Sequence, residues 1–360
     1  MHDAAAGLGW LWSNSFMQVG VACLLCAFLF TPVFGVNELF GSLFEIGFAG
    51  GHGTAGGMAS VFTDSFNWAD GADLGKTTAT IGLLAGIFGG MAIINIAVRK
   101  KWTKVLTEPA SGNAAKEVFD EGDPNHEPSA YATISQDVVE PFAFHLGIIG
   151  LAILIGRLIV WGFGQIFGYS GLPLFPFAMI GGWVINIIAQ RVPLLRALFD
   201  RKTFQRIQGM ALEILVTCAM ASISIPVVLA YWAPLLIGTV VIMVFMVFWT
   251  LWLSPRIFND CWFEQAIIRY GAFCGVAAVG YMLLRSADPK METDAGTIYA
   301  LDGPLMSPFI GGGLVTSMWP FLITSMGAMK FGFIACGISL AILVVLRLFF
   351  WKKDFKMQQR

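Results

Sequence analysis

Long apolar runs separated by short polar segments dominate this chain. A membrane-spanning helix needs about 20 mostly apolar residues. Eight runs meet that length: Phe16–Gly35, Thr77–Val98, Phe142–Phe167, Leu172–Gln190, Ile207–Tyr231, Ala233–Leu253, Met306–Met326 and Phe331–Phe350. The pattern predicts an all-α polytopic membrane protein with about eight transmembrane helices in this chain.

Two further apolar stretches, Val36–Phe62 and Trp262–Arg285, are interrupted by glycines. Glycine lowers helix stability but permits tight turns and close backbone approach. Non-helical backbone is tolerated at membrane depth only where protein or a water-filled cavity surrounds it. We therefore predict that both stretches are re-entrant hairpins rather than plain spans.

Lysine and arginine collect in three places and set the predicted orientation, because cytoplasmic loops are enriched in these residues. The three groups lie within Arg99–Lys104, Arg191–Arg206 and Lys352–Lys356. Placing all three in the cytoplasm puts the first hairpin outside, and it requires the second hairpin to enter from the cytoplasm. Hairpins that enter from opposite faces are expected of an inverted-topology repeat.

The same interpretation divides the chain into two transporter halves joined by a linker. The predicted parts are an incomplete N-terminal half, 1–100, with its hairpin at 36–62; a polar, acidic cytoplasmic linker, 101–140; a C-terminal half, 141–351, with its hairpin at 262–285; and a cytoplasmic tail, 352–360. One span precedes the first hairpin whereas four precede the second. An inverted repeat therefore leads us to expect about three further N-terminal spans.

Composition agrees with a membrane protein and argues against other classes. The chain is 57% hydrophobic and 12% charged, whereas a soluble domain carries about a quarter charged residues. A net charge of −1 without a basic cluster argues against a nucleic-acid partner. Cys23 and Cys26 have CxxC spacing, but small apolar side chains in a Leu/Phe-rich helix are the simpler interpretation. No catalytic motif is found, so we expect neither an enzyme nor a cofactor beyond a coupling ion.

The candidate chemistry lies at the glycine-rich centres of the two hairpins. In the first, His52 and Thr54 stand within the run Gly50-Gly51-His52-Gly53-Thr54. Histidine titrates near physiological pH, so His52 could couple to protons or bind a carboxylate; bonding to backbone to orient the hairpin is an equal alternative. Thr54 supplies a hydroxyl. Backbone carbonyls of the hairpins could bind Na⁺, a hard cation that prefers oxygen ligands.

The second hairpin has glycines but no histidine at its centre, around Cys274 and Gly275. Arg269 and Arg285 stand on either side of this centre. Arg285 could meet a substrate carboxylate, since a guanidinium binds carboxylates through two hydrogen bonds. An arginine that extends to the lipid headgroups is the favoured alternative.

The run Gly50–Thr54, with the small residues after it, resembles the GGHGT signature of the sodium/glutamate symporter family. The order of elements is also similar: signature hairpin, glycine-rich span, cytoplasmic linker, second half, second hairpin. The run Glu213–Ile223 resembles the corresponding helix of that family in the types of residue it contains. The resemblance covers roughly Gly35 to Gly327.

This resemblance implies Na⁺-coupled uptake of L-glutamate by a homodimeric, two-domain transporter in a lipid membrane, the bacterial inner (plasma) membrane. It implies that the hairpins meet near the membrane midplane and that Gly50, Gly51, His52, Gly53 and Thr54, with Cys274 and Gly275, surround the substrate and ion. Two departures stand out: the second hairpin lacks the family's Thr-Pro run, and Phe331–Phe350 is an additional span. Another organic anion, H⁺ coupling, or a non-transporting truncated module stay open as alternatives.

Overall fold

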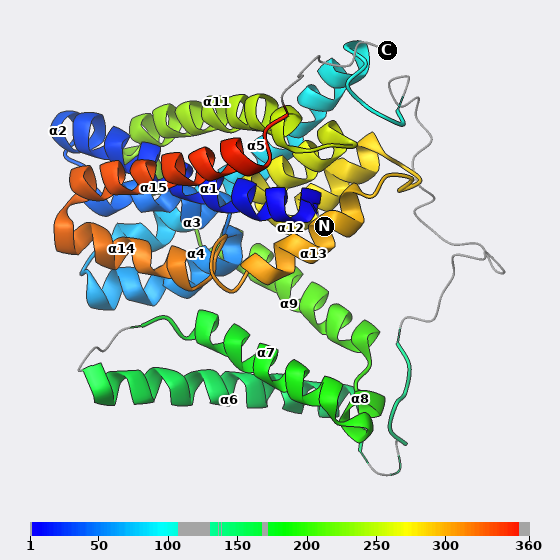
Figure 1. The fold of residues 1–360 in the computed structure, drawn as a ribbon. Coiled ribbons are helices and arrows are strands. Elements are labelled where there is room, and N and C mark those ends of the chain that lie inside the picture. The colour runs from blue at the N-terminus through cyan, green and yellow to red at the C-terminus, as the bar shows by residue number, and fades with distance from the viewer. Residues whose placement is uncertain (1, 107–129, 136, 138, 168–171, 353–360) are drawn as a thin grey trace. The chain divides into compact units, whose positions relative to one another are not determined.

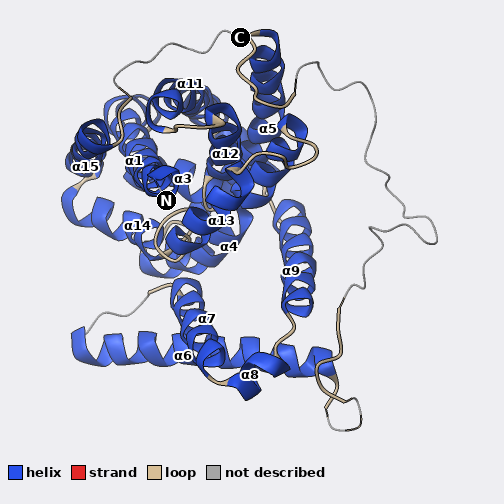
Figure 2. Cartoon of the chain, turned by 45° about the vertical axis from the view of Figure 1, so that its right-hand side comes forward, coloured by secondary structure: helices blue, strands red, loops and turns tan. Residues whose placement is uncertain are grey.

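The computed structural model describes the chain except residues 1, 107–129, 136, 138, 168–171 and 353–360. Throughout these described residues the regular elements are helices, which confirms the all-α class (Figure 2). Seven of the described helical segments are long and apolar enough to cross a membrane: His2–Phe34, Ala69–Arg99, Pro141–Ile166, Leu174–Arg191, Trp232–Ile257, Trp262–Ala287 and Ala328–Phe349. The protein is therefore an integral membrane protein.

Two of the eight predicted spans are not among these seven, and the prediction was wrong for both. The run Ile207–Tyr231 is divided between helix α9 (Arg201–Ala221) and the short helix α10 (Ile225–Ala230), with a non-helical break at 222–224. The run Met306–Met326 holds a glycine turn, so that only Leu314–Met326 (α14) is a continuous apolar helix. In both cases apolar composition continued across a backbone break.

The described contacts group the chain into two compact units, residues 1–110 with 219–360, and residues 111–218. The proposed division at 100, 140 and 351 stays a prediction, and most of the linker 101–140 lies outside the described residues.

Small residues bring the first and last helices of the larger unit together. Helix α1 (His2–Leu25) continues through a π-helical turn, Cys26–Phe30, into α2 (Thr31–Phe34). It lies beside α15 (Ala328–Phe349) in both ribbon views (Figures 1 and 2). Gly20 faces the backbone of Gly332 so closely that an added Cβ would lie 3.1 Å from its carbonyl oxygen. His2 is the first residue of α1.

In the smaller unit, α6 (Pro141–Phe167) packs along α7 (Leu174–Arg191), and the short α8 (Pro193–Leu198) leads to α9 (Figure 1). An added Cβ at Gly156 would lie 2.5 Å from the backbone nitrogen of Ala178, and one at Gly181 would lie 2.3 Å from the carbonyl oxygen of Ala152. Contact between small residues is the usual basis of helix association in membranes.

Asp200 caps the start of α9. Its carboxylate accepts hydrogen bonds from the backbone N–H of Thr203 at 2.9 Å and from the Thr203 hydroxyl at 2.6 Å. Burial raises the pKa of Asp200, but these bonds and one from the backbone of Tyr131 outweigh burial and lower the pKa below its ordinary 3.8. The carboxylate therefore stabilises the fold at pH values above 3.8, and this contribution is lost as the pH falls through the lower, folded pKa.

We expect Asp200→Ala to lower the free energy of unfolding by about 0.5–2 kcal/mol, the usual cost of losing a helix cap. Thermal unfolding in detergent at pH 7 measures this loss, and Asp200→Asn, which keeps an accepting oxygen, serves as the matched control. Equal losses in the two variants would show that the cap contributes nothing.

Candidate functional site

The long helix α5 (Ala69–Arg99) positions both glycine-rich hairpins. The first limb of the first hairpin is α3 (Leu43–Phe48). The carbonyl of Leu43 accepts a hydrogen bond from the hydroxyl of Thr78 at 3.1 Å, and an added Cβ at Gly82 would lie 2.9 Å from the ring of Phe48. Helix α3 therefore runs parallel to α5.

The second limb, α4 (Gly51–Ser60), runs back along the same helix. His52 contacts Thr80 of α5. Ala55, three residues further along the limb, lies opposite Gly75 of α5, where an added Cβ would be 3.6 Å from the Cβ of Ala55. At the end of this limb the ring of Phe62 packs edge to face on Trp68, which precedes α5, with 5.5 Å between the ring centroids. The stretch 43–60, with its π-helical continuation, is thus a helical hairpin whose tip lies at Ala49–Gly51.

Helix α12 (Trp262–Ala287) is also a hairpin, because its backbone is non-helical at Gly275 (φ −153°) and Val276 (φ 66°). The two halves fold against each other: an added Cβ at Gly271 would lie 2.7 Å from the Cα of Gly280. Only glycine allows limbs to approach so closely, which explains the glycines on both sides of this tip.

The second hairpin approaches α5 from the opposite end. An added Cβ at Gly82 would lie 2.6 Å from the carbonyl oxygen of Cys274, and one at Gly90 would lie 2.3 Å from the side chain of Leu283. The tip therefore rests near Gly82, while the limbs extend toward the C-terminal end of α5. The first hairpin, in contrast, extends toward its N-terminal end.

The two tips meet. Gly51 has φ +65°, and an added Cβ there would lie 2.4 Å from Cγ1 of Val276. Val276 itself has φ 66° and ψ 166°, a conformation that a β-branched residue adopts only under strain. Local strain held by surrounding structure is concentrated at functional sites.

Each tip also brings helix ends together. The last turn of one limb presents carbonyl groups without intrahelical partners, and the first turn of the next presents N–H groups without them. The carbonyl ends carry partial negative charge and the N–H ends partial positive charge. A pair of such tips can therefore hold a cation on carbonyl oxygens and an anion on backbone N–H groups.

The predicted residues of the first signature are distributed around this meeting point. His52 is 4% exposed, and its Nε2 lies 3.0 Å from the Thr80 hydroxyl on α5. Thr54 is buried, and its hydroxyl donates to the carbonyl of Gly50 at 2.9 Å, so it closes the tip locally. Gly53 is exposed, as are Ala277 and Ala278 just beyond the second tip.

Cys274 and Gly275, the predicted residues of the second hairpin, lie against α5. Cys274 is fully buried, and Gly275 would place a Cβ 3.1 Å from the Cα of Leu83. The structure therefore gathers the residues of both predicted motifs around one place. Their role in binding stays a prediction.

A third glycine turn, Gly311–Gly313, touches the first tip. Gly312 (φ +101°) would place a Cβ 2.2 Å from the hydroxyl oxygen of Thr54 and 3.2 Å from the Cα of Gly50. The turn joins α13 (Ala295–Met306) to α14. It lies inside the run predicted as a plain span, so sequence reasoning missed it.

Glu45, in the first limb, fixes that turn to the hairpin. Its buried carboxylate accepts hydrogen bonds from Ser15 at 2.8 Å, Thr316 at 3.1 Å and Trp319 at 3.1 Å. A buried carboxylate needs such partners, because removing an unpaired charge from water is costly. The carboxylate thus joins α1, the first hairpin and α14.

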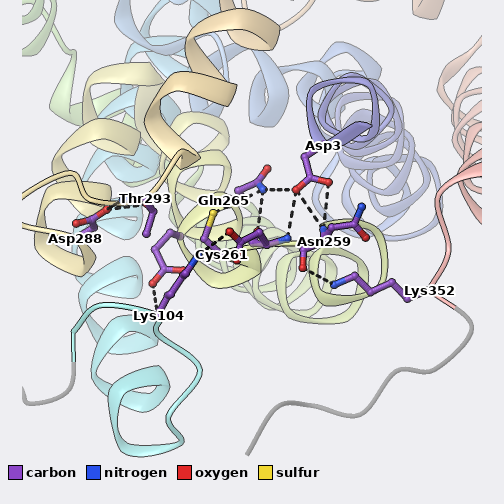
Figure 3. Close-up of polar contacts among 10 residues, drawn as sticks. Asp3, Lys104, Asn259, Cys261, Gln265, Asp288, Thr293 and Lys352 are labelled. Carbon is purple, nitrogen blue, oxygen red and sulfur yellow. Dashed lines mark hydrogen bonds and ion pairs between the residues drawn. The ribbon is translucent and has the colours of Figure 1, made fainter. Parts of the chain in front are cut away.

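The base of the second hairpin is held by charged residues. Arg269, predicted only to stand beside the hairpin centre, is fully buried and forms an ion pair with Asp302 of α13. Its guanidinium also lies 4.6 Å from the ring centroid of Phe258. Nearby, Gln265 donates to Asp3 at 2.9 Å (Figure 3).

Lys104, from the segment after α5, completes this base. Its ammonium group lies 2.6 Å from Asp260, and its backbone N–H donates to Glu264 at 2.6 Å (Figure 3). Bonding to Asp260 raises the pKa of Lys104 and, in return, lowers that of Asp260. The basic segment after α5 is thus tied to the base of the second hairpin.

Two helical hairpins that meet tip to tip within a helical membrane protein are typical of the class of secondary transporters built on broken helices. The chain matches the sodium/glutamate symporter family over residues 14–279. It therefore belongs to that family, a family of transporters and not of enzymes, with glutamate and Na⁺ as the implied substrates. The match ends earlier than the predicted Gly327. Comparisons with curated proteins and with solved structures returned no match.

No group of three or more His, Cys, Asp and Glu side chains that could hold a metal is found among the described residues. Two fully buried amides lie on α1, at Asn14 and Gln18. Sequence reasoning missed both: Asn14 precedes the first predicted span, Phe16–Gly35, and Gln18 lies just inside it.

Proposed function

We propose that this protein couples the entry of L-glutamate to the entry of Na⁺ by alternating access, with the two hairpin tips forming the site. The observation that carries the proposal is the contact between Gly51 and Val276 on the glycine face of α5. Backbone N–H groups at the starts of the second limbs suit the substrate's carboxylates, and carbonyl oxygens at the ends of the first limbs suit Na⁺.

Coupling follows from this arrangement. An ion bound to carbonyl groups at the tips would order them and so raise the affinity for the anionic substrate, and the substrate would raise the affinity for the ion by the same factor. The dimer and the lipid membrane implied by the family resemblance belong to the same proposal. Two alternatives stay open: H⁺ as the coupling ion in place of Na⁺, and another organic anion as the substrate in place of L-glutamate.

Uptake of radiolabelled L-glutamate into proteoliposomes, with an inward Na⁺ gradient or with choline in its place, tests the proposal. We expect uptake only with the gradient. His52→Ala removes a buried partner of Thr80, and the loss of such a bond typically costs about 1–3 kcal/mol, so we expect uptake to fall on the order of tenfold to hundredfold.

Thr63→Val is the matched control, because Thr63 is exposed on the same hairpin and bonds only to neighbouring residues. Uptake that ignores Na⁺ but follows a pH gradient would replace Na⁺ by H⁺. No glutamate uptake by a folded protein would overturn the proposed substrate. Equal uptake by His52→Ala and Thr63→Val would remove His52 from the site.

A further inference from the structure

Two amide side chains on α1 are completely buried and have no hydrogen-bond partner. Asn14 and Gln18 are 0% exposed, and neither the oxygen nor the nitrogen of either amide is bonded. The hydroxyl of Thr250, 1% exposed on α11 (Trp232–Ile257), is likewise unbonded. Leaving such groups unsatisfied in a dry interior is costly, so each needs an explanation.

Helix register brings these three side chains to one place. Asp3 contacts Asn259 and Trp10 donates to Ser254 at 3.1 Å, so α1 and α11 run antiparallel. One turn further along each helix from the Trp10–Ser254 contact come Asn14 and Thr250. Gln18 follows after another turn on the same side of α1.

The place lies beside the hairpin tips. One turn before Asn14, Trp10 packs its ring 5.7 Å from Phe273, two residues before the second tip. One residue after Asn14, Ser15 bonds to Glu45 in the limb that leads to the first tip. Around the axis of α1, Asn14 and Gln18 lie between Trp10, which faces α11, and Ser15, which faces α3.

We propose that Asn14, Gln18 and Thr250 provide side-chain oxygens for a buried Na⁺ site next to the tips. Na⁺ is a hard cation that prefers oxygen ligands, and three neutral oxygens suit a single positive charge better than a divalent ion, which needs carboxylates. The amide N–H groups would then donate to water bound with the ion. This inference rests on the proposed function, since it supplies the coupling ion with ligands from α1 and α11.

The test is Na⁺-dependent thermal stability of the whole protein in detergent, titrating NaCl against choline chloride at constant ionic strength without glutamate. A ligand that binds the folded state raises the unfolding temperature in a concentration-dependent way. We expect Asn14→Leu and Thr250→Val to raise the half-saturating Na⁺ concentration by at least about tenfold, the effect of one lost ligand of ordinary strength.

Thr239→Val is the control, because Thr239 is another unbonded hydroxyl on α11 and lies about three turns from Thr250. Should Asn14 only fill space, Asn14→Leu would raise stability and leave the Na⁺ dependence unchanged, which overturns the site. No Na⁺ effect on the unaltered protein would mean a buried water instead. Na⁺-driven glutamate uptake with unchanged Na⁺ dependence in both variants would overturn this inference and leave the proposed function intact.

Discussion

Gly51→Ala is expected to abolish transport and to destabilise the protein. The left-handed backbone at Gly51 costs an alanine about 1–2 kcal/mol. The new methyl group would also lie 2.4 Å from Cγ1 of Val276, which belongs to the opposite tip. Both effects separate the tips, so uptake should be lost more completely than stability.

The partner substitution makes this prediction specific. Val276→Gly removes both the colliding side chain and the strained conformation of a β-branched residue. We expect Val276→Gly to raise the unfolding temperature, and the double variant to recover part of the stability and uptake lost in Gly51→Ala. Uptake and thermal unfolding are measured for the four members of this cycle, with Gly337→Ala in α15, where an added Cβ would meet no atom within 4 Å, as control. Additive effects would contradict contact between the tips.

Asp302→Asn is expected to cost about 3–5 kcal/mol of unfolding free energy, because it leaves the buried charge of Arg269 without its counter-ion. Both side chains are fully buried. Replacing the pair together, as Arg269→Met with Asp302→Leu, should restore most of the loss, since an apolar pair of similar volume is often neutral or stabilising.

The exposed ion pair of Lys104 and Asp260 offers the matched comparison. Asp260→Asn should change stability by less than about 1 kcal/mol, the usual range for surface pairs. Unfolding in mixed micelles by a denaturing detergent measures all three variants. An Asp302→Asn loss no larger than that of Asp260→Asn would show that the buried charge is compensated by other groups.

The sequence could predict the spans and the glycine-rich breaks because both are local properties. Apolar length marks a span, and the run Gly50–Thr54 marks a break whatever surrounds it. It could not reveal which residues meet. Asp302 stands 33 positions from Arg269, and nothing in the composition of either segment indicates that the two charges share a buried site.

The sequence also did not indicate which polar residues are buried or where an apolar run is broken. Asn14 lies in a weakly apolar stretch and falls outside the predicted span Phe16–Gly35, yet α1 begins at His2 and buries it completely. The turn at Gly311–Gly313 was missed because the residues on both sides of it are apolar, so that the hydropathy of the whole run predicts a single span. Packing against the first tip, and not hydropathy, determines this break.

The glycine face of α5 sets the direction in which the tips can separate. Gly82, Gly86 and Gly90 offer the second hairpin backbone instead of side chains. A tip displaced along such a face meets few rotamers that must change, whereas displacement away from it exposes closely packed backbone. Because both tips rest on this one helix, we expect opening of the proposed site to move the tips apart along the axis of α5.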